Sequence, residues 1–166
     1  MGTGEAGIAE LSDGRLYYNS RSHWNAKKPP LRRREAWSAD GGETWTGWRI
    51  VAVLPDGPQA TNYGCFAGLV RLPIADRDIL LYSNCDSPAG RKRGTVWVSF
   101  DGAKTWPLKR LVWEDPFQYS SLSAGRPGTE SEGWIYMHFE GRLPQSRVAR
   151  FNLSWLMAGE PAGDGE

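Results

Sequence analysis

The chain has 166 residues, a length that predicts one domain of ordinary size with a substantial core. Its 20 Lys and Arg nearly cancel its 19 Asp and Glu, which argues against nucleic acid or a membrane surface as a partner. A hydrophobic content of 40% excludes a disordered chain. No apolar run approaches the roughly 20 residues that a membrane span needs.

The same composition favours strands over helices. The chain contains 20 Gly and 11 Pro, the residue types that destabilise helices most. It also contains 9 Trp, and its basic residues are mostly Arg, the side chain suited to bidentate binding of carboxylates. The opening segment MGTGEAG has neither a basic stretch nor an apolar one, so no signal peptide is predicted, and the compartment stays open.

The chain alternates between short strands and tight turns along nearly its whole length. Asp13-Gly14 is a strong signal for a hairpin turn. A single helical turn is expected at Ser154–Ala158, and the predicted fold class is all-β. The expected strands are Ile8–Leu11, Arg15–Arg21, Arg34–Ser38, Trp48–Leu54, Cys65–Leu72, Asp78–Ser83, Thr95–Phe100, Lys109–Trp113, Tyr119–Ser123, Trp134–Phe139 and Val148–Leu153.

One motif occurs twice, 61 residues apart. Ser38–Trp45 reads SADGGETW and Ser99–Trp106 reads SFDGAKTW. Within each copy the Asp carboxylate can accept hydrogen bonds from turn amides, glycine can supply a positive φ, and the Trp can fold back over the turn. Ala103 stands where the pattern has glycine, which predicts strain or an altered turn in the second copy.

This S-x-D-x-G-x-T-W pattern resembles the Asp box, or BNR repeat, of sialidases and related β-propellers. The matched positions are Ser38, Asp40, Gly42, Thr44, Trp45, Ser99, Asp101, Thr105 and Trp106. Asp boxes are structural turns at blade edges, so by themselves they imply a propeller and no particular chemistry.

Further segments, in the same order along the chain, resemble the exo-α-sialidase (neuraminidase) family. Phe66 departs from that family's G-C-Q-G segment, in which Gln is expected. The resemblance covers roughly residues 4–157 and implies the C-terminal half of a six-bladed propeller: about three antiparallel four-stranded blades within residues 1–158, followed by a polar tail, 159–166. The matching segments are Glu5–Gly14 with Leu16–Arg21, Gly64-Cys65 with Gly68, Leu80–Asn84 with Arg91, Tyr119–Leu122, and Phe151–Leu156.

The resemblance also implies roles for individual residues. Sialidases use a Tyr nucleophile instead of the usual carboxylate, because the sialic acid substrate is itself an anion at the reacting carbon. By resemblance Tyr119 is this nucleophile and Glu5 is its base, while Arg21 and Arg91 bind the substrate carboxylate. Glu140 stands where the family often has Tyr-Glu and is assigned to substrate binding.

Several alternatives stay open. Tyr119, Glu5 and Arg21 also fit ordinary strand or surface positions, and Arg93 competes with Arg91 for the second arginine position. Cys65 and Cys85 permit a disulfide without requiring one.

Other kinds of site find little support in the sequence. His23 and His138 lie in no metal-ligand context, no phosphate-binding loop is present, and no metal or cofactor is expected. His23, Trp24 and Tyr63 could line a sugar pocket.

The family's first carboxylate-binding arginine and its Asp general acid precede the matching segments, and neither context occurs here. We therefore expect a chain that is truncated or is completed by a missing N-terminal half, since a partial propeller exposes a sheet edge. The favoured function is a sialidase-like retaining glycosidase acting on sialylated glycans. The alternatives are a non-catalytic propeller segment that binds glycans or proteins, and a propeller glycosidase that acts on another sugar.

Overall fold

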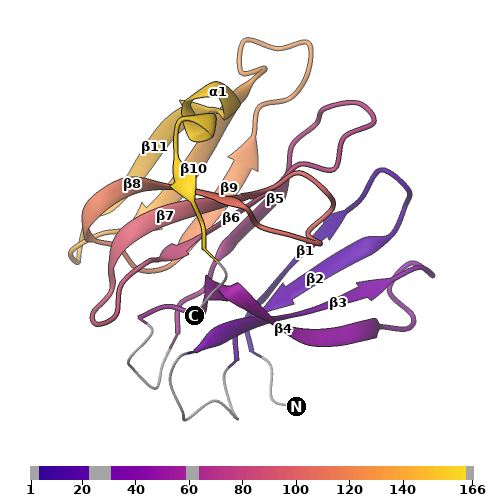
Figure 1. Cartoon of the computed structure of the whole chain (residues 1–166). Coiled ribbons are helices and arrows are strands. Elements are labelled where there is room, and N and C mark those ends of the chain that lie inside the picture. Colours follow the sequence, from indigo (N-terminus) through magenta and orange to yellow (C-terminus); the bar gives the residue numbers. More distant parts are fainter. Residues whose placement is uncertain (1–3, 23–30, 59–63, 164–166) are drawn as a thin grey trace.

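The computed structural model describes residues 4–22, 31–58 and 64–163, and it is built almost entirely of strands (Figure 1). Each of the eleven expected strands overlaps an observed one, and the expected helical turn is α1, so the all-β prediction is confirmed. The elements are β1 (Ala6–Glu10), β2 (Leu16–Ser20), β3 (Arg32–Ser38), β4 (Thr46–Pro55), β5 (Gly68–Arg71), β6 (Leu80–Cys85), β7 (Lys92–Ser99), β8 (Leu108–Pro116), β9 (Ser120–Ala124), β10 (Trp134–Glu140), β11 (Ser146–Asn152), α1 (Leu153–Met157) and β12 (Glu160–Pro161).

The described strands form three antiparallel sheets in chain order. Their strand orders are β1-β2-β3-β4, then β5-β6-β7-β8 with β12 added beside β8, then β9-β10-β11. The first strands of successive sheets, β1, β5 and β9, lie next to one another, and the sheets fan out from them (Figure 1). This arrangement is a partial β-propeller that is not closed. The pairing of β12 was not expected, because the sequence there reads as a polar tail.

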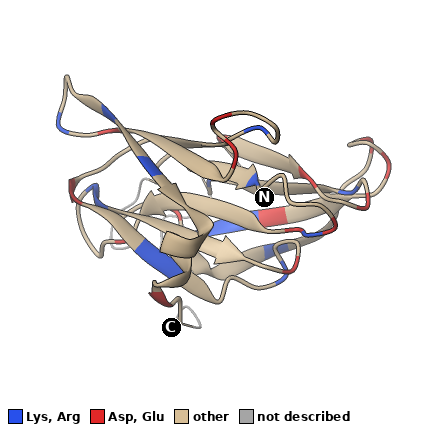
Figure 2. Cartoon of the chain, turned by 90° about the horizontal axis from the view of Figure 1, so that it is seen from above, with Lys and Arg blue, Asp and Glu red and all other residues tan. Residues whose placement is uncertain are grey.

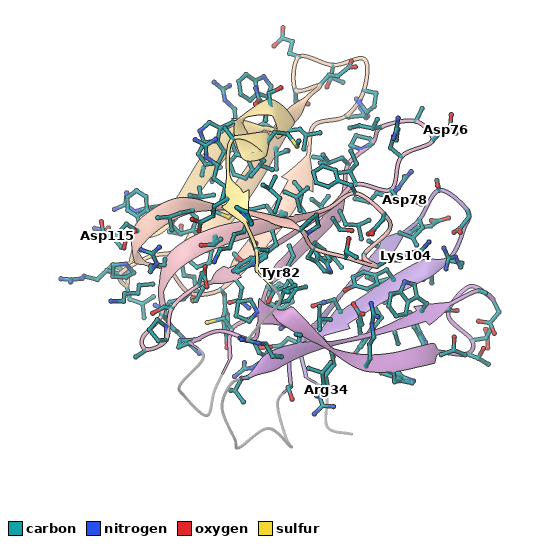
Figure 3. The ribbon with its side chains drawn as sticks, in the orientation of Figure 1. Arg34, Asp76, Asp78, Tyr82, Lys104 and Asp115 are labelled. Carbon is teal, nitrogen blue, oxygen red and sulfur yellow. The ribbon has the colours of Figure 1, made fainter. Side chains whose placement is uncertain are left out.

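Two apolar layers hold the sheets together. One layer fills the space between the first and second sheets and includes Tyr17, Tyr82, Trp97 and Trp106. Tyr82 points into this space from β6, as Figure 3 shows. The other layer joins the second and third sheets around side chains such as Phe117. Burial of these large aromatic surfaces supplies most of the driving force for stacking the sheets.

The two copies of the repeated motif form turns with the same hydrogen bonds, and we call them the first and second repeat turns. In the first, Gly42 N–H donates to Ser38 Oγ at 2.9 Å, and Thr44 N–H donates to Asp40 Oδ1 at 2.9 Å. The Thr44 hydroxyl donates to the other oxygen of Asp40. These bonds replace the backbone pairing that ends as β3 gives way to β4.

The second repeat turn keeps this pattern in spite of its alanine. Ala103 N–H donates to Ser99 Oγ at 2.9 Å, and Thr105 N–H donates to Asp101 Oδ1 at 2.9 Å. Ala103 adopts φ 68°, a left-handed conformation that L-residues rarely take. The expected strain is therefore present in the backbone of Ala103, while the hydrogen bonds of the turn are not altered.

Charged residues are spread over all three sheets. In Figure 2, positive and negative segments are scattered over the molecule, and neither sign dominates the view. Within the described ranges, no helix is both long and apolar enough to span a membrane.

Candidate active site

Strand pairing brings Glu5 and Arg21 together at one end of the first sheet. Ala6 pairs with Ser20, so the residues just outside these strands face each other, and Arg21 N–H donates to the Glu5 carbonyl at 2.9 Å. Their side chains also meet, because Arg21 Nη1 donates to Glu5 Oε2 at 2.7 Å. Arg21 is buried, while the Glu5 side chain is partly exposed.

Tyr119 joins this pair from the third sheet, directly before β9. The same atom of the guanidinium, Arg21 Nη1, lies 3.3 Å from Tyr119 Oη and donates to it. Arg21 is thus the link between Glu5 and Tyr119, and in the part of the chain that the structure describes no direct hydrogen bond joins the carboxylate to the phenol.

Arg91, just before β7, contacts the ring of Tyr119. Its guanidinium carbon lies 5.3 Å from the centre of the Tyr119 ring, within the range of a cation–π contact. Arg91 Nη2 donates to the Gly64 carbonyl at 3.0 Å, and Nη1 donates to Gln118 Oε1 at 3.1 Å. Two guanidinium groups thus contact one tyrosine, and a guanidinium is well suited to bind a carboxylate.

Arg93, the competing arginine, lies elsewhere. Arg93 Nη1 donates to both carboxylate oxygens of Glu114, at 2.6 and 2.8 Å. A strand would carry Arg91 and Arg93 on the same face, but Arg93 has φ 59° and the β7–β8 pairing shifts register on both sides of Gly94. The arginine that lies beside Tyr119 is therefore Arg91.

The charge of Arg21 depends on its partners. Burial disfavours the charged form, but the hydrogen bonds to Glu5 and Tyr119 and the nearby Glu5 carboxylate together raise the Arg21 pKa above its ordinary value. Arg21 is therefore a permanent cation.

Glu140 meets the other site residues through its backbone. Its N–H donates to the Tyr119 carbonyl at 3.0 Å, and its carbonyl accepts from Gln118 N–H at 2.9 Å. These two bonds extend the pairing between β9 and β10 to Tyr119 and help to orient the ring.

Sequence reasoning missed two residues that hold these side chains or their neighbours along the chain. Gln118 directly precedes Tyr119, and its Oε1 accepts a hydrogen bond from Arg91. Its position next to the predicted nucleophile is the sequence signal that could have identified it. Asp56 accepts from Ser22 N–H, next to Arg21, and from Cys65 N–H, but its Asp-Gly dipeptide looks like an ordinary loop signal. Only the packing of β4 against the segment that precedes β5 reveals its contacts.

Cys65 and Cys85 lie side by side beneath the site as buried free thiols, with their Sγ atoms 3.8 Å apart. Cys85 Sγ donates to the Phe117 carbonyl at 3.0 Å. The contact between the two thiols lowers the pKa of Cys65. The same contact, together with burial, raises the pKa of Cys85. The disulfide that the sequence permits is absent in this structure.

Some predictions fall outside the described residues. His23, Trp24 and Tyr63, which could line a sugar pocket, lie in segments that the structure does not describe. Within residues 4–22, 31–58 and 64–163, no three His, Cys, Asp or Glu side chains gather in a way that could hold a metal ion.

The amino-acid sequence of the chain is similar to that of known sialidases. No protein-family model matches it. It is 34% identical over 158 residues to a sialidase of Micromonospora viridifaciens, which covers 94% of this chain and 23% of that protein. It is 31% identical over 129 residues to a sialidase of Bacteroides fragilis, and this match covers 73% of this chain and 22% of that protein. The chain thus spans less than a quarter of these relatives.

A solved structure shows the same arrangement of sheets. The microbial sialidase Hz136 superposes with a TM-score of 0.70 at 26% identity, over 93% of this chain and 28% of that chain. The fold and the sequence identity place the chain in the class of sialidase-like β-propellers. The chain is a homologue of the sialidases and corresponds to a part of their propeller.

Proposed function

We propose that the chain is part of an exo-α-sialidase, a retaining glycosidase that releases terminal sialic acid from glycoconjugates. The observation that carries this proposal is the single Arg21 nitrogen that bonds both the Glu5 carboxylate and the Tyr119 hydroxyl, with Arg91 against the Tyr119 ring. Homology to sialidases supports the same class of reaction.

In this proposal each residue has a defined task. Arg21 and Arg91 bind the substrate carboxylate through charge-assisted hydrogen bonds and so orient the anomeric carbon toward Tyr119. The Tyr119 oxygen then attacks that carbon while its proton passes to Glu5, and the bond to the leaving sugar oxygen breaks. Water later displaces Tyr119 from the same carbon, which releases sialic acid and restores the free phenol. Glu140 helps to hold the substrate from the β10 side.

The acid that protonates the leaving group is proposed to lie outside this chain. We propose that residues 1–158 form the C-terminal half of the propeller and that an N-terminal half completes it, because the chain spans so little of its relatives. The two repeat turns fit the Asp boxes of such a propeller, since both hold the expected network of Ser, Asp and Thr bonds.

The free face of the first sheet supports completion by a further sheet. Its outward side chains Ile8, Trp48 and Ile50 are 55%, 45% and 57% exposed, although they are large and apolar. Apolar patches of this kind mark surfaces that another element covers. The same face favours the second candidate function, in which the chain is a non-catalytic segment that binds a protein partner.

Sialic acid binding by the chain as it stands tests the proposal. Arg91→Lys should weaken binding of sialic acid at least tenfold in a calorimetric or NMR titration, because lysine cannot make the forked contact. Arg93→Lys is the matched control and should leave the affinity within twofold. Equal effects of the two variants on the affinity, or an affinity that neither variant changes, would contradict the assigned site.

Hydrolysis of 4-methylumbelliferyl sialic acid tests completeness. We expect the isolated chain to release no fluorophore. Release of fluorophore by the isolated chain would refute the need for a second half. If Tyr119→Phe then abolishes the release while Phe in place of the half-buried Tyr136 does not, the role of Tyr119 as nucleophile is supported.

A further inference from the structure

Asp56, a fully buried carboxylate at the end of β4, holds the backbone on both sides of the candidate site. Its Oδ2 accepts from Ser22 N–H at 2.9 Å, and its main-chain carbonyl accepts from Cys65 N–H at 3.1 Å. Its own N–H donates to the Leu31 carbonyl at 3.0 Å. One residue therefore ties together three chain segments that are distant in sequence.

Two of these segments carry the arginines or their anchors. Ser22 directly follows Arg21, and Cys65 directly follows Gly64, whose carbonyl accepts from Arg91 Nη2. The packing here leaves no spare room, because a Cβ added to Gly64 would lie 1.9 Å from the Asp56 carbonyl oxygen. Any movement of Asp56 must therefore move the support of Arg21, of Arg91, or of both.

Arg33 fixes the Asp56 carboxylate in turn. Arg33 Nη1 donates to Asp56 Oδ1 at 2.9 Å, and Arg33 Nε donates to Asn19 Oδ1 at 2.7 Å. Asn19 lies in β2, two residues before Arg21. Both members of the Arg33–Asp56 pair are fully buried.

Such a pair contributes little net stability. Burial raises the pKa of the Asp56 carboxyl in spite of the opposing charge and hydrogen bonds of Arg33, so desolvation outweighs the attraction. A buried ion pair can often be replaced by apolar side chains without loss of stability, which leaves geometry as its physical contribution here.

We propose that Asp56, held by Arg33, is a positioning residue that sets the spacing of Arg21 and Arg91 so that both can bind one carboxylate group. Asp56 does not touch the ligand. The inference rests on the proposed function, because it assumes that the two arginines share a carboxylate ligand. It predicts that Asp56 matters for recognition of the carboxylate and not for general affinity.

The first sheet offers a matched control in Glu35. Glu35 is also a fully buried carboxylate paired with an arginine, Arg49, and it accepts from the Tyr17 hydroxyl at 2.6 Å. It lies in β3 opposite Arg49 of β4, and its partners do not include Ser22 or the Gly64 segment. Glu35→Gln removes a buried negative charge, as Asp56→Asn does, and leaves the direct hydrogen bonds of Asp56 to Ser22 and Arg33 in place. Glu35 reaches Arg33 indirectly, through Tyr17 and Asn19, and its own partner Arg49 is half exposed.

The test compares 2-deoxy-2,3-didehydro-N-acetylneuraminic acid with its methyl ester by calorimetric titration of the full chain. The unmodified chain should prefer the acid at least tenfold. Asp56→Asn should reduce this preference to less than threefold, and Glu35→Gln should leave it within twofold of its original value. Equal weakening of acid and ester by Asp56→Asn, or an equal change of the preference in Glu35→Gln, would overturn the inference.

A variant that keeps the charge guards against loss of the fold. Asp56→Glu retains the buried ion pair with Arg33 but lengthens the side chain by one methylene, so it should shift Ser22 and still reduce the preference for the acid. An unchanged preference in a folded Asp56→Glu chain would also refute the positioning role.

Failure of the proposed function gives a different result. If the unmodified chain binds neither compound, the assigned carboxylate site is wrong. The positioning claim is then decided by the Nε–Hε NMR signals of Arg21 and Arg91, assigned through Lys variants. Both signals should shift in Asp56→Asn and stay in place in Glu35→Gln. Unmoved signals in Asp56→Asn would refute it.

Discussion

The two repeat turns share their hydrogen bonds but differ in what surrounds their tryptophans. Trp106 of the second turn is 3% exposed and packs between Tyr82 of its own sheet and Tyr17 of the sheet before it. Trp45 of the first turn is only half-buried, and its ring contact is with Tyr18 of its own sheet. Within the described residues, the first sheet has no sheet before it for Trp45 to pack against.

This difference shows what each part of the motif contributes. The Ser, Asp and Thr bonds close a turn by local contacts, so they form in both copies alike. The Trp acts between sheets, so its burial depends on a neighbouring sheet. The first turn therefore lies on a sheet that has no neighbouring sheet on this side among the described residues, in agreement with the exposed Ile8, Trp48 and Ile50.

The largest expected effect concerns the two tryptophans. Trp106→Ala should lower the free energy of unfolding by about 3–5 kcal/mol, because it opens a cavity between two sheets. Trp45→Ala should cost only about 1–2 kcal/mol, because less apolar surface is lost. Urea titration followed by circular dichroism measures both. Equal costs would mean that Trp45 is covered in solution, for example by a second copy of the chain.

A smaller effect is expected where the turns differ in sequence. Gly42 has φ 98°, so Gly42→Ala should cost about 1 kcal/mol of backbone strain. Ala103→Gly should change stability by less than about 0.5 kcal/mol, because relief of strain is offset by the loss of a buried methyl and by a more flexible unfolded chain. Thermal unfolding of both variants measures these two changes in stability. A loss above 1 kcal/mol in Ala103→Gly would show that packing of the methyl dominates.

The smallest effect is the pH dependence of the exposed first turn. Hydrogen bonds from the Thr44 side chain and backbone and from Ser38 lower the pKa of Asp40 from 3.8 to about 2. Its stabilising contribution should be complete above about pH 4 and disappear as the pH falls toward 2, because the folded state holds the proton less tightly. The stability difference between the unmodified chain and Asp40→Asn should shrink over this range. A constant difference would refute the role of the charge.

Much of the fold follows from local sequence. Alternating side chains bounded by Gly, Pro and Asp predict each strand, and the Asp13-Gly14 dipeptide marks the hairpin between β1 and β2. The resemblance also selected Glu5, Arg21, Arg91 and Tyr119, and the structure brings these four side chains together. Their catalytic roles remain predictions.

Other features could not be predicted because they depend on backbone irregularity or on distant contacts. The choice between Arg91 and Arg93 follows from the left-handed backbone at Arg93 and the bulge around Gly94, which simple strand alternation does not anticipate. The contacts of Asp56 join Ser22, Leu31, Arg33 and Cys65 across two sheets, and no local pattern encodes them.

The sequence by itself determined the all-β class, the positions of the strands and the internal bonds of both repeat turns, because these depend on residues that are near neighbours in the chain. Only the tertiary structure decided which arginine faces Tyr119, which tryptophan is buried and which carboxylate supports the site. Those outcomes depend on how separate sheets pack against one another, and packing of this kind is a property of residues that are distant in sequence and close in space.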